Sequence, residues 1–396
     1  MRPILPVFVI VCLDAASSGA VLPVLPFFLR DLGATPLVLG LVLGAEALSQ
    51  FVAAPWLGQL SDRYGRRTVL LASQAGALAS LALLAMADSV VFVLLARALL
   101  GLTAANFSAA AAYAADHSSP ADRRQAIGIL SAGLGLGGMV GPGLSGALAG
   151  LSLSAPVWAA MALSAASLLA TALWLDGGAP RDGTGPGEAV RERTSLRSLL
   201  ASPAIRVVVA ILLCHYVSYG LFSSQLAVFL GDTFSWNGHA FGPRELGILL
   251  AADGAINIAV QLLLLPWLGR RLTERRLVVL VFGLLSAGYV LASLATGIPM
   301  LALAVLCVST GVALARPTFI AGLSVHVPWR HQGVVMGTIQ SLVAVTDMVT
   351  PVLAGAIVGQ RLYGAWLGAV VATALAGAVI AHRFLRLRDG PGAIRP

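Results

Sequence analysis

Six charged residues lie inside long apolar runs, where a charge needs either a partner or a task. They are Asp14, Glu46, Asp253, Asp347, Arg97 and Arg316. A charge at membrane depth costs about 2.5 to 3.5 kcal/mol on insertion scales unless it faces the interior and is paired. A carboxylate in surroundings of low dielectric can bind and release a proton near physiological pH. Four acids face only two arginines, so at least one acid lacks such a partner and is the predicted proton carrier; the alternative is that the acids only join helices through ion pairs.

Uncharged polar residues accompany these charges at helical spacing. Asp253, Asn257 and Gln261 recur every fourth residue, which places them on one helix face. Gln50 likewise follows Glu46 by four residues. We expect both faces to point into a substrate cavity rather than at lipid. The other residues predicted to line it are Arg97, Asn106, His215, Gln225, Arg316 and Gln340, although a hydrogen-bonded core histidine is the favoured interpretation of His215.

The composition places these residues in a membrane protein. The chain has 396 residues, 58% hydrophobic and 11% charged, whereas a soluble domain carries roughly a quarter charged residues. All 25 basic residues are arginines that lie mostly between apolar runs, which indicates membrane topology rather than nucleic-acid binding. Cys12, Cys214 and Cys307 sit apart in apolar runs, so we expect neither a disulfide nor a metal site.

Twelve apolar segments are long enough to cross a bilayer core, which takes about 20 residues. One long polar stretch, Asp176 to Arg206, divides them six and six. We therefore predict an all-α membrane protein with a six-helix half at 1–175, a cytoplasmic linker at 176–206 and a second six-helix half at 207–396. The predicted spans are 4–29, 37–57, 68–87, 90–114, 124–149, 156–174, 207–230, 245–268, 277–296, 299–322, 333–358 and 363–384.

The arginines predict the orientation. With the N-terminus in the cytoplasm, 20 of them fall on the cytoplasmic side and only Arg30, Arg244 and Arg361 on the other. The positive-inside rule then places both termini in the cytoplasm of a cell whose inner membrane holds the protein. The first apolar run carries Asp14 and lacks a small-residue cleavage site, so we expect a retained helix rather than a removable signal.

The two halves echo one another at an offset near 209 residues. The repeat indicates a pseudo-two-fold arrangement around a central cavity, although chance matches are an alternative in a chain with 43 glycines. The matching residues are Gly128, Pro142 and Gly146 with Gly337, Pro351 and Gly355.

A short charged stretch, Gly58 to Arg67, separates the second and third apolar runs. We expect Gly58 to permit close helix contact, Gly65 to adopt φ > 0 and Asp62 to cap a helix. The stretch resembles the loop signature of the major facilitator superfamily of transporters, and Asp116 could pair with Arg66 to close an inner gate; an ordinary charged loop is the alternative. The residues that carry the match are Gly58, Asp62, Arg63, Gly65, Arg66 and Arg67.

The fifth segment carries small residues at intervals that let a neighbouring helix approach its backbone, and Pro142 is expected to bend it. This pattern resembles the fifth-helix signature of drug/proton antiporters within the superfamily, with packing alone as the alternative. In the fourth segment, Arg97 and Gly101 match the superfamily's Arg-x-x-x-Gly motif, and we expect Arg97 to pair with a buried carboxylate or carbonyl. The fifth-segment residues are Gly128, Gly137, Gly141, Pro142 and Gly146.

Together with Leu13-Asp14-Ala15, these motifs resemble the tetracycline/proton antiporters of TetA type. The resemblance implies that Asp14 takes part in transport and Asp62 in gating. The chain departs from that family at two positions. Asn257 stands where the family has a histidine in the eighth helix, and Leu285 stands near the position of the family's acid in the ninth helix. The additional Arg316 could favour a substrate with an anionic group.

The leading hypothesis is a proton-coupled exporter of an amphipathic organic compound that works by alternating access. The alternative within transporters is a symporter or facilitator of an organic anion, with Arg97 and Arg316 as the partners of that anion. The histidines do not recur at a spacing typical of a catalytic or metal site, and no ATP-binding loop of the GxxxxGK[ST] type occurs, so we expect neither an enzyme nor a cofactor. A receptor or scaffold without transport is a further alternative. The expected partners are a small-molecule substrate, protons and membrane lipid, with no nucleic acid, and we expect a monomer.

Overall fold

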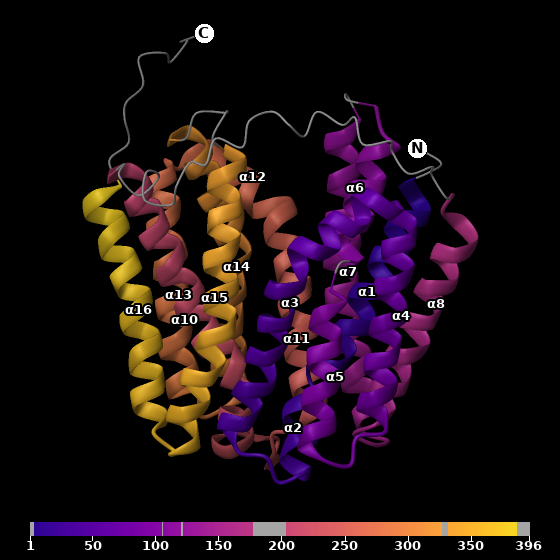
Figure 1. Ribbon diagram of the computed structural model, residues 1–396. Coiled ribbons are helices and arrows are strands. Elements are labelled where there is room, and N and C mark those ends of the chain that lie inside the picture. Colours follow the sequence, from indigo (N-terminus) through magenta and orange to yellow (C-terminus); the bar gives the residue numbers. More distant parts are fainter. Residues whose placement is uncertain (1–3, 105, 120–121, 177–202, 327–331, 386–396) are drawn as a thin grey trace.

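The computed structural model is a bundle of long, nearly parallel helices (Figure 1). It describes residues 4–104, 106–119, 122–176, 203–326 and 332–385. We call the end at which the first helix begins and the last one ends the terminal end, and the other the opposite end. Among the described residues, twelve helical segments are long and apolar enough to cross a membrane, which confirms the predicted fold class and spans.

The helices fall into two groups along the chain, indigo to magenta and rose to yellow in Figure 1. The first group contains α1 (Ile4–Val21), α2 (Leu25–Asp31), α3 (Pro36–Tyr64), α4 (Arg66–Ala85), α5 (Val90–Leu102), α6 (Asn106–Asp116), α7 (Arg123–Ala149) and α8 (Ala155–Trp174). The second contains α10 (Pro203–Thr233), the hairpin β1 (Ser235–Trp236) and β2 (His239–Ala240), α11 (Pro243–Ala259), the π-helix η1 (Val260–Leu264), α12 (Leu265–Arg271), α13 (Glu274–Leu294), α14 (Ile298–His326), α15 (Gln332–Gly359) and α16 (Tyr363–Phe384).

Each group buries its own apolar side chains. In the described part of the chain, the largest cluster takes all its buried members from residue 205 onward. Two smaller clusters take theirs only from residues 7–175. Van der Waals contacts between the helices of each group therefore hold these clusters together, because lipid is as apolar as the helix side chains and supplies no hydrophobic drive between helices. The predicted linker lies mostly outside the described residues, and its boundaries stay a prediction.

Three spans that hydropathy predicts as continuous helices are interrupted. The first breaks between α1 and α2, where Pro23 cannot donate a backbone hydrogen bond. The fourth breaks between α5 and α6, where the Thr103 hydroxyl donates to the carbonyl of Leu99 over 3.0 Å. The eighth contains the π-helical turn η1, a feature that is frequent at functional sites. Each interruption gives nearby side chains a direction that a regular helix would not.

The charged stretch after the second span is mostly helix rather than turn. α3 continues to Tyr64 and α4 begins at Arg66, so the chain reverses at Gly65 alone, whose φ of +88° was expected. Asp62 lies inside α3 and does not cap α4, because Gly65 occupies the cap position. Gly58 has open space where a side chain would stand, so the predicted close helix contact there is wrong.

The two groups meet most closely at the opposite end, through two pairs of helices. Where α7 crosses α11, a Cβ on Gly247 would lie 2.5 Å from the Cα of Gly146 and 2.8 Å from the carbonyl oxygen of Pro142. Where α3 crosses α15, Gly40 faces the carbonyl of Pro351. Pro142 and Pro351 are the two prolines that the predicted internal repeat relates, and each lies where a helix of one group crosses a helix of the other, which agrees with that repeat.

Replacing Gly247 with leucine should open this end. The added side chain meets backbone atoms of α7, and overpacking costs about 1 to 3 kcal/mol, enough to shift the balance of conformations roughly 5- to 150-fold. We expect slower transport and easier access to the interior from this end. The probe is Ser223→Cys, in the acidic cavity described below, in a protein without its three native cysteines. An impermeant thiol reagent added on the side of the membrane that the opposite end faces should label it faster. Gly283→Leu is the control, since Gly283 is exposed with open space beside it; equal labelling in both variants would contradict the contact's role.

Candidate functional site

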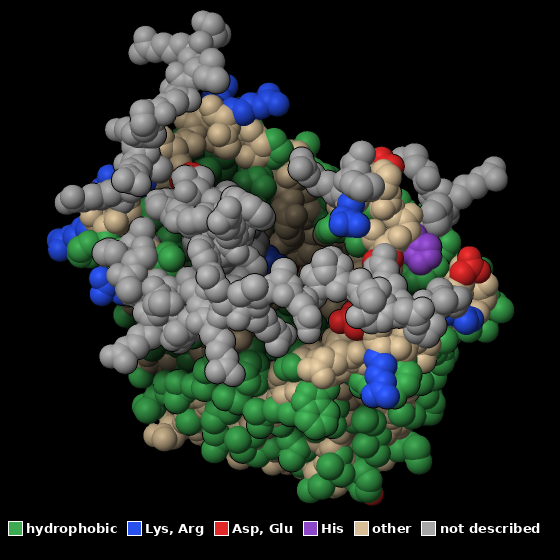
Figure 2. Space-filling view, turned by 45° about the horizontal axis from the view of Figure 1, so that its top comes forward, with side chains coloured by type: hydrophobic (Ala, Val, Ile, Leu, Met, Phe, Trp, Pro, Cys, Tyr) green, Lys and Arg blue, Asp and Glu red, His purple; other side chains and the backbone are tan. Residues whose placement is uncertain are grey.

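Two cavities lie side by side in the interior and share a wall. The acidic cavity, of about 430 Å³, opens among α3, α10, α11, α14 and α15 and has mostly apolar walls that carry Asp253 and Asp347. The polar cavity, of about 490 Å³, lies among α1, α3, α5 and α6; its walls are also mostly apolar, and it is named for the polar side chains Asp14, Arg97 and Asn106 that they carry. The shared wall consists of Leu22, Glu46 and Gln50. The terminal end of the bundle shows a central recess between the helix groups (Figure 2).

A buried ion pair occupies this shared wall. The Glu46 Oε2 atom on α3 lies 2.5 Å from the Arg97 Nη2 atom on α5, and the two side chains are 25% and 5% exposed. α5 can approach because Gly101 rests against the backbone of α3 at Glu46 and Gln50. The predicted pairing of Arg97 with a buried carboxylate is therefore present, and Glu46 is its partner.

Asp14 is held by hydrogen bonds inside the first group of helices. The Gln74 amide on α4 donates to the Asp14 Oδ2 atom over 3.2 Å and to the Ser167 hydroxyl on α8 over 2.9 Å. The Ser167 hydroxyl donates in turn to the carbonyl of Ile10 over 3.2 Å. This network joins α1, α4 and α8, and within the described residues the Asp14 carboxylate makes no ion pair with an arginine.

The two acids of the second group face the acidic cavity. Asp253 on α11 accepts a hydrogen bond from the Ser309 hydroxyl on α14. Asp347 on α15 is exposed to the cavity and makes no hydrogen bond or ion pair within the described residues. Arg316 is also exposed and makes none there, and it lines neither cavity. Of the four intramembrane acids, only Glu46 is paired with an arginine in the described part of the chain.

Several predicted cavity residues lie elsewhere. The Gln261 amide donates to the Asn257 Oδ1 atom over 2.6 Å, which agrees with one helix face, but neither residue lines the two cavities. Gln261 stands about 12 Å along the helix from Asp253 at 1.5 Å per residue, so only the first member of the polar face reaches the acidic cavity. Gln340 is exposed and lines neither cavity.

His215 and Gln225 are buried in the second group, outside both cavities. The His215 ring packs against Tyr219 and Phe319, and its Nδ1 atom has no hydrogen-bond partner among the described residues. The Gln225 amide donates to the carbonyl of Pro36 over 3.2 Å. Both side chains therefore lie in the packing between helices.

Three residues of these networks were not predicted: Gln74, Ser167 and Ser309. Gln74 is an amide within an apolar run, the same signal that identified Gln50, and could have been found. The two serines carry no such signal, since small hydroxyl residues are common in membrane helices and serve packing there as well.

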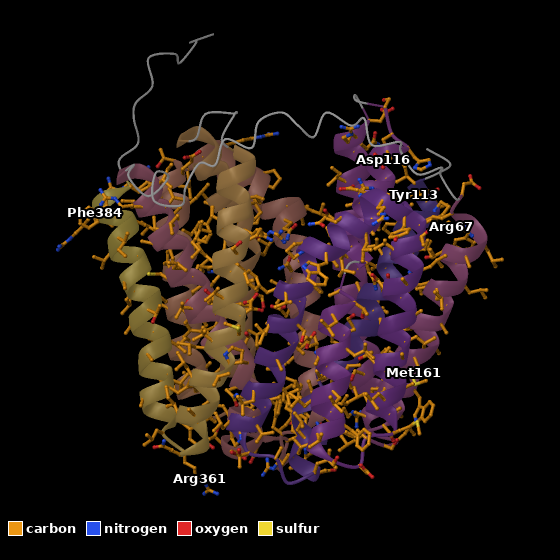
Figure 3. The ribbon with its side chains drawn as sticks, in the orientation of Figure 1. Arg67, Tyr113, Asp116, Met161, Arg361 and Phe384 are labelled. Atoms are coloured by element: carbon orange, nitrogen blue, oxygen red, sulfur yellow. The ribbon has the colours of Figure 1, made fainter. Side chains whose placement is uncertain are left out.

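Residues of the charged stretch from Gly58 to Arg67 form a cluster with Asp116 at the terminal end (Figure 3). Arg66 contacts Asp62 at 2.7 Å and Asp116 at 3.4 Å, which is the predicted contact with Asp116. The Arg67 guanidinium donates to the carbonyl of Ala172 over 2.8 Å. These residues belong to α3, α4, α6 and α8, so the contacts join helices of the first group, and a role as inner gate stays a proposal.

The fifth-span motif divides between two neighbours. Gly137 and Gly141 rest against the backbone of α1, and Gly146 against that of α11. Gly128 is exposed and has open space beside it. Pro142 lies inside α7 with its ring against Gly19 of α1. The motif thus packs α7 between the first-group helix α1 and the second-group helix α11.

A family model and several curated proteins match this chain along most of its length. The family model described as "Major Facilitator Superfamily" matches residues 7–351. The chain belongs to this superfamily. Two similar relatives are the class G tetracycline resistance protein of Vibrio anguillarum, 35% identical with 91% of each chain covered, and the class C tetracycline resistance protein of Escherichia coli, 31% identical with 88% of this chain and 87% of that one covered. Multidrug resistance protein 2 of Bacillus subtilis is 25% identical, with 87% and 86% covered.

Solved superfamily structures share the fold. The nucleoside transporter NupG superposes with a TM-score of 0.78 at 13% identity, with 97% of this chain and 98% of that one covered. The chain is accordingly a multi-pass membrane transporter of the Major Facilitator Superfamily, and a small-molecule substrate follows from that membership.

In this superfamily member an ion pair links the two helix groups at the opposite end. The Arg30 guanidinium on α2 lies 3.0 Å from the Asp232 Oδ1 atom on α10. The Tyr363 hydroxyl on α16 donates to the Asp232 Oδ2 atom over 2.7 Å. Tyr363 belongs to the same group as Asp232, so it can hold the carboxylate in place whether or not Arg30 is near. The pair must separate whenever the opposite end opens.

Replacing Asp232 with asparagine should favour opening at this end. Exposed ion pairs contribute about 0.2 to 1 kcal/mol, so we expect a modest effect, at most about fivefold in the accessibility of the Ser223→Cys probe. The exchange Arg30→Asp with Asp232→Arg should restore the original labelling rate. Tyr363→Phe should change it less than Asp232→Asn, and a charge exchange that fails to restore the rate would exclude the ion pair as the cause.

Proposed function

We propose that this transporter exports an amphipathic organic cation from the cytoplasm across a bacterial inner membrane in exchange for protons, as a monomer with both termini in the cytoplasm and without a cofactor. The names of its relatives, which include tetracycline, multidrug and quinolone resistance proteins, support export of drug-like compounds. The excess of arginines at the terminal end supports the orientation.

One observation carries the choice of a cation. The acidic cavity combines apolar walls with the carboxylates of Asp253 and Asp347, and no arginine or histidine belongs to its described lining. Such a surface favours an apolar body with a positive charge and opposes an anion. The alternative of an organic anion depends on Arg97 and Arg316, but Arg97 is paired with Glu46 and Arg316 lines neither cavity.

The same carboxylates supply the exchange. A cation and a proton compete for Asp347, because protonation removes the charge that attracts the substrate. Substrate binding from the cytoplasm would therefore release a proton, and protonation from the other side would expel the substrate. The close packing at the opposite end and the recess at the terminal end fit a conformation open toward the cytoplasm (Figure 2). Rocking of the two helix groups about the cavities would then provide alternating access.

The test is proton release from acid-loaded proteoliposomes. Each compound of a panel of cationic, zwitterionic and anionic amphiphiles of similar size is added outside, and both its uptake and the internal pH are followed. We expect cations to drive proton release and anions to have no effect; empty liposomes correct for passive permeation of the amines. Uptake of anions that is indifferent to the proton gradient would contradict the proposal and favour the facilitator.

A further inference from the structure

The polar cavity is a second compartment of the same site. It meets the acidic cavity at Glu46 and Gln50, which line both. Binding sites for drug-sized molecules occupy about 300 to 1,000 Å³, so either cavity alone holds a small compound and the pair holds an elongated one. The two compartments differ in chemistry, which decides how such a molecule would lie.

The polar cavity offers hydrogen bonds and carries less negative charge than the acidic cavity. Its arginine, Arg97, is neutralised by Glu46, and its Nε atom has no hydrogen-bond partner in the described structure. Asp14 is already engaged by Gln74. The remaining carboxylate, Asp14, would repel an anionic group, and its hydrogen bond from Gln74 makes it a weaker partner for a cation than Asp347 of the acidic cavity, which is unpaired within the described residues. A neutral group that both donates and accepts hydrogen bonds fits this balance.

Asn106 is the side chain placed to recognise such a group. It is the first residue of α6, directly after the break in the fourth span, and it lines the polar cavity. It makes no hydrogen bond within the described residues, and its Oδ1 atom is among the buried atoms without a partner. Rotating the amide exchanges its donor and acceptor ends, so both chemistries are available to a ligand.

We infer that the transported molecule has two parts: an apolar cationic part held in the acidic cavity, and a neutral amide or hydroxyl group held in the polar cavity by Asn106 and Gln50. This inference rests on the proposed function and adds a second subsite to it. The first subsite supplies the attraction that competes with the proton, and the second selects among cations.

The experiment uses two matched probes in proteoliposomes of the full chain. Both carry a dialkylaminoalkyl group on a benzene ring, and the opposite ring position carries either a primary carboxamide or the similarly shaped isopropyl group. The quantity compared is the ratio of the affinity for the carboxamide to the affinity for the isopropyl probe. We expect this ratio to be about tenfold higher in the unaltered protein than in the Asn106→Leu variant, because the substitution removes hydrogen bonds to a buried polar group. The ratio of the two transport rates at low probe concentration should change in the same direction. Asp347→Asn should lower the affinity for both probes by the same factor. Gln360→Leu, in a loop at the opposite end, should change neither affinity.

The outcomes separate the two proposals. If the cations drive proton release but Asn106→Leu leaves the ratio between the probes unchanged, the second subsite is excluded and the proposed function stands. If neither cation is exchanged for protons, the proposed function itself fails. Should Asn106→Leu not fold, Gln50→Leu on the exposed shared wall tests the same selectivity; a ratio unchanged in that variant also overturns the inference.

Discussion

The Arg97→Met variant should lose transport together with about 3 kcal/mol of its free energy of unfolding. Removing one partner of a buried ion pair leaves the other charge uncompensated and costs about 3 to 5 kcal/mol. The Glu46 side chain keeps 25% exposure to the cavities, which places the expected cost at the lower end. The measurement is unfolding of the purified protein in detergent, followed by substrate uptake in proteoliposomes.

Two companion variants make this prediction specific. Glu46→Gln combined with Arg97→Met removes both charges and should recover most of the lost stability, although not transport. Arg361→Met removes an exposed arginine in the loop between α15 and α16, whose side chain makes no hydrogen bond or ion pair within the described residues, and we expect a change within about 0.5 kcal/mol. A double variant no more stable than Arg97→Met would show that lost packing, rather than an unpaired Glu46, causes the effect.

The sequence predicts the elements of this fold well because the membrane restricts the choice. Spans without internal hydrogen bonding are not viable in lipid, so long apolar runs become helices. Pairing of Arg97 was predictable for the same reason, since an unpaired guanidinium at that depth is costly. The identity of its partner was not, because hydropathy does not say which helices face one another. Glu46 became the partner through the contact of Gly101 with α3.

Positions within the site were harder to predict than the spans. The period of four correctly placed Asn257 and Gln261 on one face, but it carries no information on how deep the cavity extends. The break before Asn106 was hidden because Thr103 and its neighbours keep the run apolar enough to read as one helix. The hydrogen bond from Ser309 to Asp253 joins residues 56 positions apart on different helices. Such contacts depend on the rotation of packed helices, which sequence patterns of single spans leave open.

The Asp347→Asn variant should uncouple the substrate from the proton. Asp347 is the one intramembrane acid that lines the acidic cavity with no hydrogen bond or ion pair in the described part of the chain. In the unaltered protein, substrate affinity should rise with pH, because a cation binds the ionised carboxylate and competes with the proton. In the variant this pH dependence should flatten, and substrate-driven proton release should fall by at least about tenfold, as the loss of a charge-assisted contact of about 1.5 to 3 kcal/mol implies. Binding at several pH values and proton release in proteoliposomes measure the two effects.

The other acids decide between one carrier and several. Asp14 lines the polar cavity and is held by Gln74, so Asp14→Asn should leave the pH dependence of cation binding in place even if it slows transport. Asp88→Asn, in the loop between α4 and α5, is the control for loss of a carboxylate away from both cavities. If Asp14→Asn instead flattens the pH dependence and Asp347→Asn does not, the proton binds in the first group of helices, and cation and proton do not compete for one site. Coupling would then have to pass through the conformation of the shared wall, where Glu46 and Arg97 join the two cavities, rather than through direct displacement.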